Sequence, residues 1–348
     1  MSSRLDFIDR PINPPGPHLF TVISLFAGCG GSSLGYKWAG GKVLAAVEKD
    51  KNAAETYRRN HEGTLIIERD VITLTGEELM QACGIKPRDL DVLDGSPPCQ
   101  GFSVAGKRQM KDSRNQLFQE YVRLLRELQP KSFIMENVSG MIKGKMRLIF
   151  AEIIRELKAS GYTVRAWLLN AIYFGVPQRR ERIIFIGARE DIGIKPTCLR
   201  AQTSAITARI AIDSLVVNEK ERAFLLCAGD KYVAYEDWER IPYGRSRKDL
   251  GLSGFNCVKF HPDRPANTVR KSDGYLTMHG AMHWRERRRF TVAEFRRFGG
   301  FPDAFDFGPD WANAVQQIGN SVPPRFMQAI AEHIRDTVII PSHSLQVA

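Results

Sequence analysis

A cysteine that directly follows two prolines is the first candidate for chemistry in this sequence. Cys99 stands after Pro97 and Pro98 in the segment DVLDGSPPCQGFS, residues 91–103. Each proline restricts its own φ angle, so the pair holds the thiol on a stiff turn, and the small neighbours leave access to it. Most single cysteines are inert buried side chains, but an exposed and oriented thiol suits nucleophilic work. We predict that Cys99 is a nucleophile.

A glutamate ends the next apolar run. The segment SFIMEN, residues 132–137, predicts a strand that finishes on Glu136 and Asn137, at the same rim of a sheet as Cys99. A carboxylic acid beside a nucleophile can protonate or hydrogen-bond a ring under attack. We predict that Glu136 has this role.

Polar side chains at alternate positions lead into a later apolar run. In FGVPQRRERIIFIG, residues 174–187, Gln178, Arg180 and Arg182 alternate. Because alternate positions of an extended chain share one face, we expect these three side chains to point together at a bound polar group. Arg179 has the opposite parity, and a solvated side chain is the plainer interpretation there.

Glycines and acids at the ends of the first three predicted strands indicate a cofactor site. The run TVISLF, residues 21–26, is followed by AGCGG, whose glycines permit a sharp turn close to a ligand. Their spacing is not Gly-x-Gly-x-x-Gly, which argues against a dinucleotide. Glu48 and Asp70 end the next two strands, where carboxylates can accept hydrogen bonds from ribose hydroxyls and an adenine amino group. Each acid alone has a plainer explanation, such as a helix N-terminal charge at Glu48, but together they favour a cofactor.

Short apolar runs that alternate with amphipathic segments must position these groups. The predicted strands are 21–26, 43–48, 65–67, 91–95, 132–137, 164–170 and 182–188. The predicted helices between and after them are 32–40, 51–60, 117–129 and 146–161. This alternation predicts an α/β fold with a doubly wound, mostly parallel sheet that is covered on both faces.

The pattern lapses after about residue 189. Residues 190–285 contain only weak strand-like pieces, NTVRK (267–271) and YLTMH (275–279), and predict a second, smaller domain. A helical apolar period returns at 323–338, behind a pair of prolines.

Composition limits the classes of protein. Fifty Lys and Arg against 39 Asp and Glu give a net charge of +11, which slightly favours a polyanionic partner. Six scattered cysteines without a CxxC pair argue against a zinc site or a disulfide framework. No signal peptide or long apolar run is present, so we expect a soluble cytoplasmic protein, associated with the nucleoid if the source is prokaryotic.

In combination the motifs resemble the DNA (cytosine-5) methyltransferase family of the bacterial restriction-modification type. The resemblance runs from about Thr21 to Thr337, with a gap over the middle stretch. Its motifs, in the family's order, are SLFAGCGG, GSPPCQGFS, ENV, QRRER, RRRFTVAEFRRFGGFPDAF and QQIGNSVPP. It implies a Rossmann-like fold that binds S-adenosyl-L-methionine and transfers its methyl group to C5 of a flipped-out cytosine in duplex DNA, through a covalent bond from Cys99 to C6.

The resemblance assigns roles to individual residues. It implies that the catalytic residues are Cys99, Glu136, Arg180 and Arg182, where the arginines support the flipped base and the activated nucleophile. It implies a cofactor site made by Phe26, Gly28, Gly30, Glu48, Asp70, Val71, Pro98, Asn320 and Val322. It places at the DNA the residues Gln100, Ser103, Asn137, Gln178 and Thr268.

Three positions depart from the family's pattern. Ser24 stands where many members have Asp, Ser96 where many have Gly, and Gly299 where a larger residue often precedes Gly-Phe-Pro. None of them alters the nucleophile or the glutamate.

The resemblance also implies a discontinuous catalytic domain. We expect an irregular N-terminal arm, a catalytic domain, a target-recognition domain, and a hinge with the penultimate motif, at residues 1–20, 21–189 plus 317–348, 190–288, and 289–316. Near the hinge, phosphate contacts are expected from Arg285, Arg287, Arg288 and Arg289. The expected partner is double-stranded DNA, bound by a monomer without a metal or a membrane.

Three alternatives differ in class. A transfer-RNA cytosine-5 methyltransferase would share these motifs, but that branch carries a Cys-Phe-Thr segment that this sequence lacks. A catalytically silent family member that only binds DNA would usually have lost Cys99 or Glu136. A nicotinamide dehydrogenase conflicts with the glycine spacing and with the Pro-Pro-Cys-Gln segment.

Overall fold

A computed structural model of the chain describes residues 5–98, 116–144, 146–232, 235–251, 257–276 and 280–345. Contacts between residues divide the chain into two compact units. Unit 1 comprises residues 1–12, 171–180 and 201–326, and unit 2 comprises residues 13–170, 181–200 and 327–348. The domains expected from the sequence were defined by function, whereas these units are defined by contacts. The boundaries of the expected domains therefore stay a prediction.

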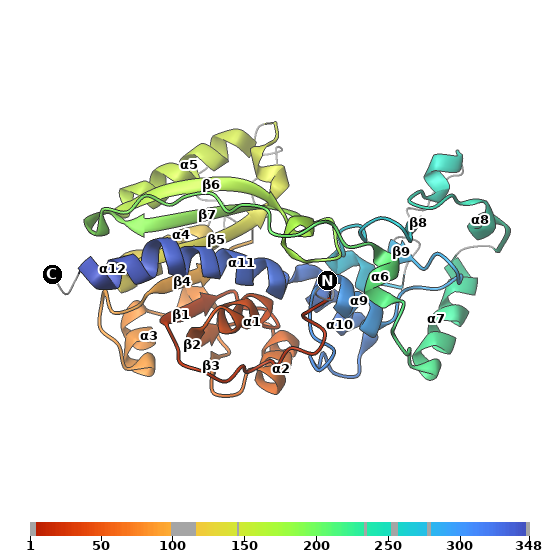
Figure 1. The fold of residues 1–348 in the computed structure, drawn as a ribbon, viewed down its shortest axis with the longest axis horizontal. Coiled ribbons are helices and arrows are strands. Elements are labelled where there is room, and N and C mark those ends of the chain that lie inside the picture. The colour runs from red at the N-terminus through yellow and green to blue at the C-terminus, as the bar shows by residue number, and fades with distance from the viewer. Residues whose placement is uncertain are drawn as a thin grey trace. The chain divides into compact units, whose positions relative to one another are not determined.

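A seven-stranded sheet forms the centre of the described part of unit 2, in the order β3-β2-β1-β4-β5-β7-β6 (Figure 1). Its strands are β1 (Phe20–Leu25), β2 (Gly41–Val47), β3 (Leu65–Ile67), β4 (Val92–Gly95), β5 (Ser132–Val138), β6 (Tyr162–Asn170) and β7 (Glu181–Arg189). The pairs among β1 to β5 are parallel, whereas β7 runs antiparallel to both β5 and β6. The predicted α/β class with a mostly parallel sheet is confirmed.

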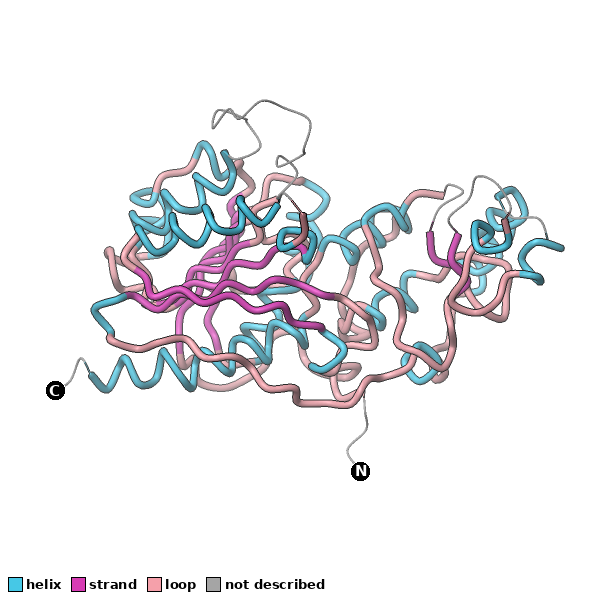
Figure 2. Tube along the Cα trace, turned by 90° about the horizontal axis from the view of Figure 1, so that it is seen from above, coloured by secondary structure: helices cyan, strands magenta, loops and turns pink. Residues whose placement is uncertain are grey.

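Helices cover both faces of this sheet (Figure 2). They are α1 (Gly31–Trp38), α2 (Lys51–Asn60), α3 (Gly76–Cys83), α4 (Gln116–Leu128) and α5 (Met146–Ala159). On one face, α3, α4 and α5 bury a continuous apolar core that includes Leu25, Leu93, Phe133 and Phe185. Because side chains alternate along a strand, Ser24, Asp94 and Glu136 lie on the other face of the sheet.

Among the helices that lie between strands of unit 2, α3 was not predicted from the sequence. Helix α3 begins at a capping box, in which Thr75 and Glu78 satisfy each other's backbone N–H groups, and ends at Gly84 with a φ of 66°. Both signals are visible in the sequence, so the helix could have been predicted from them.

Unit 1 is built from short elements. Its helices include α6 (Ala208–Ile212), α7 (Glu219–Tyr232), α8 (Tyr235–Arg240), α9 (Val292–Phe298) and α10 (Trp311–Asn320). Strands β8 (Cys257–Lys259) and β9 (Gly280–Met282) pair in parallel. The phenylalanines of the penultimate motif pack into a core, where Phe290, Phe295, Phe298, Phe301 and Phe305 are fully buried.

Of the two weak strands predicted in this region, NTVRK is not found as a strand, and YLTMH lies largely outside the described residues. Residues 267–270 of NTVRK have no regular structure, and Lys271–Gly274 forms a 3-10 turn. This segment takes its hydrogen bonds from side chains and from an isolated bridge, Gln178 to Ala266, rather than from a neighbouring strand. YLTMH runs into residues 277–279, which lie outside the described residues.

The apolar period at 323–338 is confirmed as a helix. It forms α11 (Pro324–Ile334) and most of a π-helical turn at Arg335–Ile339, and the helix continues past the predicted end as α12 (Ile340–Leu345). None of the helices in the described ranges is long and apolar enough to span a bilayer.

Candidate active site

The register of two antiparallel strands brings Glu136 and Arg182 together. In the β5–β7 pair, Glu136 lies opposite Ile184 and Val138 lies opposite Arg182, so the glutamate and the arginine are diagonal neighbours on one face. Arg182 Nε contacts Glu136 Oε1 at 2.5 Å, and the two side chains are only 13% and 10% exposed. This polar pair at the end of an otherwise apolar strand can hydrogen-bond a ligand with both donor and acceptor groups.

The turn that leads to the predicted nucleophile is anchored by Asn137. Its amide Nδ2 donates to the carbonyl oxygen of Pro97 at 3.1 Å, and the side chain is buried. Pro98 is exposed beyond this anchor. Cys99, Gln100 and Ser103 lie outside the described residues. The contact gives Asn137 a role in holding the proline turn, which the sequence pattern did not reveal.

The glycine turn after β1 has the backbone that a close approach to a ligand requires. Phe26, Gly28 and Gly30 all have positive φ angles, of 55°, 57° and 96°. A Cβ built on Gly28 would meet no atom of the described residues within 4 Å, so the backbone is open on that side. At Gly30, a Cβ would lie 2.1 Å from Nε2 of His61, so no side chain fits.

Glu48 joins this turn to the end of β2. Its carboxylate accepts hydrogen bonds from the backbone N–H groups of Gly28 and Asp50, both at 2.8 Å. Burial raises the pKa of Glu48, and hydrogen bonds from the backbone N–H groups of Asp50, Gly28 and Lys49 oppose that shift. A carboxylate has about four acceptor positions, so these donors leave it able to accept from a ribose hydroxyl. These residues therefore fit the nucleoside part of S-adenosylmethionine.

Asp70 ends the segment after β3 and already has partners. Its carboxylate accepts from the Ile72 backbone at 3.2 Å and pairs with Lys49 Nζ at 3.1 Å. Val71 beside it is buried. This segment therefore carries an ion-paired acid next to a valine that packs in the apolar core. Across the described ranges, no three His, Cys, Asp or Glu side chains gather as metal ligands.

Gln178 and Arg180 belong to unit 1, where they bond to the backbone of that unit. Gln178 donates to the carbonyl of Phe298 at 3.1 Å and accepts from the N–H of Val269 at 3.0 Å. Arg180 donates to the carbonyls of Val269 and Gly319, each at 3.0 Å, and is 2% exposed. Their alternation in the sequence reflects a shared structural task in unit 1, because β7 begins only at residue 181.

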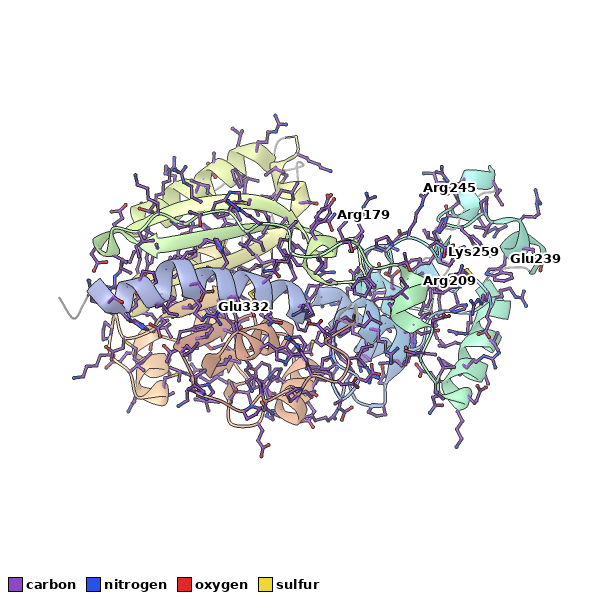
Figure 3. All side chains as sticks on the ribbon, in the orientation of Figure 1. Arg179, Arg209, Glu239, Arg245, Lys259 and Glu332 are labelled. Carbon is purple, nitrogen blue, oxygen red and sulfur yellow. The ribbon has the colours of Figure 1, made fainter. Side chains whose placement is uncertain are left out.

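The loop that carries Thr268 is held beside an exposed arginine. Thr268 Oγ1 donates to the carbonyl of Arg179 at 2.6 Å, and the Arg179 N–H donates to the carbonyl of Ala266 at 2.8 Å. The side chain of Arg179, labelled in Figure 3, is exposed. The sequence predicted a solvated side chain here, because Arg179 has the opposite parity to Gln178 and Arg180. Its place beside Thr268 could be seen only in the folded chain.

The last motif lies at the end of α10. Asn320 is the final residue of that helix and is exposed, whereas Val322 is buried. The preceding Gly319 packs so closely that a Cβ would lie 2.3 Å from the backbone carbon of Arg270. Close packing explains the glycine, and leaves the Asn320 side chain free to face solvent or a ligand.

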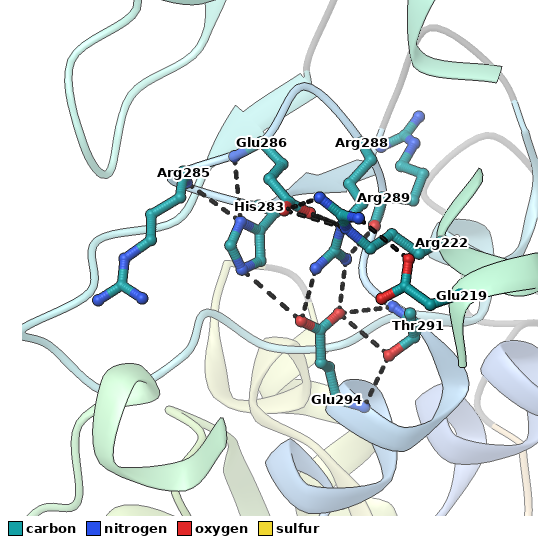
Figure 4. Close-up of polar contacts among 9 residues, drawn as sticks. All are labelled: Glu219, Arg222, His283, Arg285, Glu286, Arg288, Arg289, Thr291 and Glu294. Atoms are coloured by element: carbon teal, nitrogen blue, oxygen red, sulfur yellow. Dashed lines mark hydrogen bonds and ion pairs between the residues drawn. The ribbon is translucent and has the colours of Figure 1, made fainter. Parts of the chain in front are cut away.

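The structure corrects the expected phosphate contacts near the hinge. Arg288 and Arg289 are 3% and 4% exposed, so neither guanidinium is accessible to DNA. Arg288 instead pairs with Glu294 at 2.7 Å and also contacts Glu286 (Figure 4). Arg285 is 58% exposed and remains available. Charge spacing in the sequence does not distinguish a buried ion pair from a basic surface.

Comparison with known proteins gives consistent matches along the chain. The sequence profile of a family described as C-5 cytosine-specific DNA methylase matches residues 20–336. The type II methyltransferase M1.HphI of Haemophilus parahaemolyticus is 34% identical over 336 residues, which cover 90% of this chain and 86% of the relative. The type II methyltransferase M.NgoPII of Neisseria gonorrhoeae is 33% identical over 342 residues, covering 91% of this chain and 96% of the relative.

Solved structures resemble this fold over nearly their whole length. A protein described as a DNA modification methyltransferase, encoded within an E. coli prophage, has a TM-score of 0.74 and 25% identity, and the match covers 92% of this chain and 99% of that one. DNMT2 of Spodoptera frugiperda has a TM-score of 0.66 at 18% identity, with coverage of 90% and 99%. At 18% identity, the likeness to the Spodoptera protein shows a shared fold.

Proposed function

This chain belongs to the C-5 cytosine-specific DNA methylase family and is a DNA (cytosine-5-)-methyltransferase, and we propose that it acts through a covalent bond between Cys99 and C6 of the target cytosine. The observation that most supports this mechanism is the Glu136–Arg182 pair, at the strand end next to the one that leads into the Cys99 turn. The pair offers a donor and an acceptor to one edge of a pyrimidine ring.

The cofactor we propose is S-adenosyl-L-methionine. When bound, it supplies an electrophilic sulfonium methyl group. Glu48 accepts from its ribose hydroxyls, while the open backbone at Gly28 lets the molecule approach closely. The rest of the proposed site consists of Phe26, Gly30, Asp70, Val71, Pro98, Asn320 and Val322.

The chemistry begins when the cytosine leaves the stack, at a cost of a few kcal/mol. The Cys99 thiolate then forms a bond to C6, and the ring electrons that this displaces make C5 nucleophilic enough to take the methyl group. The bond between that methyl group and sulfur breaks, and its electron pair stays on sulfur, which leaves as a neutral thioether. Glu136 hydrogen-bonds or protonates N3 and so stabilises charge as it develops in the ring. A base, for which we propose water, then removes the C5 proton, and the bond from Cys99 to C6 breaks.

The contact between Glu136 and Arg182 leaves hydrogen-bonding groups for the base. It joins Arg182 Nε to Glu136 Oε1 at 2.5 Å, in two side chains that are almost fully buried. A carboxylate has a second oxygen and a guanidinium has five N–H donors, so in this proposal Glu136 reaches N3 and Arg182 reaches the ring carbonyl oxygen while the two stay paired. The buried charge of Arg182 thereby keeps a partner throughout.

Arg180 and Gln178 support the site as positioning residues in this proposal. Arg180 donates to the carbonyl that precedes Asn320, and Gln178 accepts from the backbone next to Thr268. We propose that Thr268 and the neighbouring Arg179 contact the DNA backbone, together with Gln100 and Ser103. Double-stranded DNA is the proposed substrate, bound by a monomer in the cytoplasm.

Trapping with a fluorinated base tests the nucleophile. A duplex with 5-fluorocytosine at the target should remain covalently attached, because fluorine cannot leave as a proton does. Peptide mass spectrometry should find the adduct on Cys99. An adduct on another cysteine, or turnover that survives in Cys99→Ser, would refute the mechanism. Transfer RNA offered in parallel should accept no methyl group, and preferential methylation of it would favour the alternative substrate.

Loss of the acid tests the second catalytic group. Glu136→Gln keeps the shape of the side chain and removes the proton donor, so the rate of methyl transfer should fall about 10²- to 10⁴-fold while DNA binding persists. Single-turnover kinetics with labelled cofactor measure the rate, and a band-shift titration measures the binding. Unchanged turnover would remove Glu136 from catalysis.

A further inference from the structure

A buried carboxyl that the proposed mechanism does not use lies at the base of the site in unit 2. Asp94 in β4 is 2% exposed. Its Oδ2 accepts a hydrogen bond from Ser24 Oγ at 2.8 Å, and its Oδ1 accepts one from the Tyr36 hydroxyl at 3.1 Å. We call Ser24, Tyr36 and Asp94 the carboxyl–hydroxyl cluster. Its members come from β1, α1 and β4, so one acid bridges three elements.

The cluster stands where both functional turns begin. Ser24 lies directly opposite Asp94 in the parallel β1–β4 pair, and Leu25 lies opposite Gly95. One residue further along β1 is Phe26, where the glycine turn starts, and the proline turn begins two residues after Gly95. Tyr36 belongs to the helix that follows the glycine turn. A displacement at this point would therefore move the cofactor turn and the turn of Cys99 relative to each other.

Titratable groups face Asp94 from the elements around it. The charge of Glu136 on β5 raises the pKa of Asp94. Burial and the charge of Asp94 in turn raise the pKa of three hydroxyls, those of Tyr36 on α1, Tyr57 on α2 and Tyr121 on α4. Burial raises the pKa of Asp94 to about 7, the hydroxyl donors oppose the rise, and the charge of Glu136 adds to it. The carboxyl therefore changes charge within the working range of an enzyme.

The two protonation states require different hydrogen bonds. As a carboxylate, Asp94 accepts from both the Ser24 and the Tyr36 hydroxyls, as observed. As a carboxylic acid, one of its oxygens becomes a donor, so one of those hydroxyls must turn round and accept. In this buried cluster such a reversal exchanges donor and acceptor in a hydrogen bond that joins β4 to β1 or to α1.

We propose that Asp94 is a positioning residue, whose hydrogen bonds to Ser24 and Tyr36 hold the ends of β1 and β4 in the alignment that methyl transfer requires. The inference rests on the proposed function, since it concerns the turns of the cofactor and of Cys99. It also accounts for Ser24, which stands where many family members have Asp. In this chain the acid is on the opposite residue of the β1–β4 pair, Asp94, so the two strands still share one carboxyl group.

Two substitutions test the proposal in the full-length enzyme. Asp94→Asn keeps the shape but cannot accept from both hydroxyls at full strength, and should lower the single-turnover rate tenfold or more. The exchanged double variant, Ser24→Asp with Asp94→Ser, keeps one carboxyl and one hydroxyl in the same place and should recover to within about threefold of the wild-type rate. Tyr36→Phe keeps the carboxyl, and its single-turnover rate should fall between the rates of those two variants. It replaces Asp94→Asn as the test if that variant does not fold.

A pH series separates positioning from general stability. The wild-type rate should change through an inflection near pH 7, and Asp94→Asn should lose that inflection. Since the folded-state pKa lies above the ordinary value, ionisation of Asp94 lowers the unfolding free energy as the pH rises from about 4 to about 7, and this slope should also flatten in Asp94→Asn. A wild-type rate and pH profile in Asp94→Asn, or no recovery in a folded exchanged variant, would overturn the proposal. Activity in Cys99→Ser would instead overturn the proposed function.

Discussion

Replacing Glu294 with glutamine probes the buried charges that organise unit 1. The carboxylate of Glu294 is 3% exposed and takes two hydrogen bonds from Arg288, at 2.7 and 2.9 Å. It also accepts from the backbone N–H of Thr291 at 2.7 Å, in a capping box that starts α9 (Figure 4). Glutamine has nearly the same shape, so the substitution removes charge without opening a cavity.

The expected cost follows from what is left behind. Removal of one partner from a buried ion pair costs about 3–5 kcal/mol, because the other charge stays desolvated. Arg288 retains a contact with Glu286. Burial raises the pKa of Glu286, but its hydrogen bonds with Arg222 and Arg288 more than offset this and lower the pKa to about 2. Glu286 therefore remains ionised at neutral pH. The remaining partner places the expected loss at the lower end, about 3 kcal/mol.

Urea unfolding, followed by tryptophan fluorescence, measures this loss. With an m-value of about 3 kcal/mol/M, a loss of about 3 kcal/mol lowers the midpoint by about 1 M. Arg285→Gln is the matched control, because its pair with Asp213 spans 3.9 Å with side chains 58% and 62% exposed. Such a pair contributes about 0–1 kcal/mol. Equal midpoints for the two variants would refute the argument that burial makes the Glu294 pair important.

Two further predictions concern ligands. Gly30→Ala should weaken S-adenosylmethionine binding about tenfold or more by calorimetry, since its φ is 96° and the new Cβ would lie 2.1 Å from His61. Gly63→Ala, with a φ of 75° but no neighbour within 4 Å, should leave binding unchanged, and similar losses in both would point to general backbone strain. Arg179→Ala should reduce the slope of log K against log salt by about 1, as expected for one lost phosphate contact. Arg209→Ala, whose guanidinium pairs with an aspartate at 2.8 Å, should not, and equal slopes would remove Arg179 from the DNA surface.

Local signals in the sequence predicted most of unit 2. The helix at 51–60 and the strand at 65–67 are found with the predicted bounds. Strand ends were readable because apolar runs stop abruptly at glycine or at an acid such as Glu48. Each of these features depends on residues within one turn or one strand, so no knowledge of the fold is needed to see it.

Contacts between distant segments were not readable in the same way. The sequence grouped Gln178 and Arg180 with Arg182, but the first two bond to carbonyls 120 and 139 positions away. It also presented Arg288 as one member of a basic run, although that side chain is buried against Glu294. Spacing along a chain reports parity and charge, and reports nothing about which distant backbone or carboxylate will be the partner.

The sequence alone determined which reactive groups are present: a thiol after two prolines, a strand-end glutamate, a glycine turn and a carboxylate at the end of the second strand. It did so because these depend on residue type and local conformation, and six motifs in order identified the family. Only the tertiary structure showed that Asn137 anchors the proline turn and that Arg182 pairs with Glu136. It also showed that Asp94 hydrogen-bonds Ser24 between the two strands from which both turns start. Strand register and burial set those partnerships, and both arise only when segments far apart in the chain pack together.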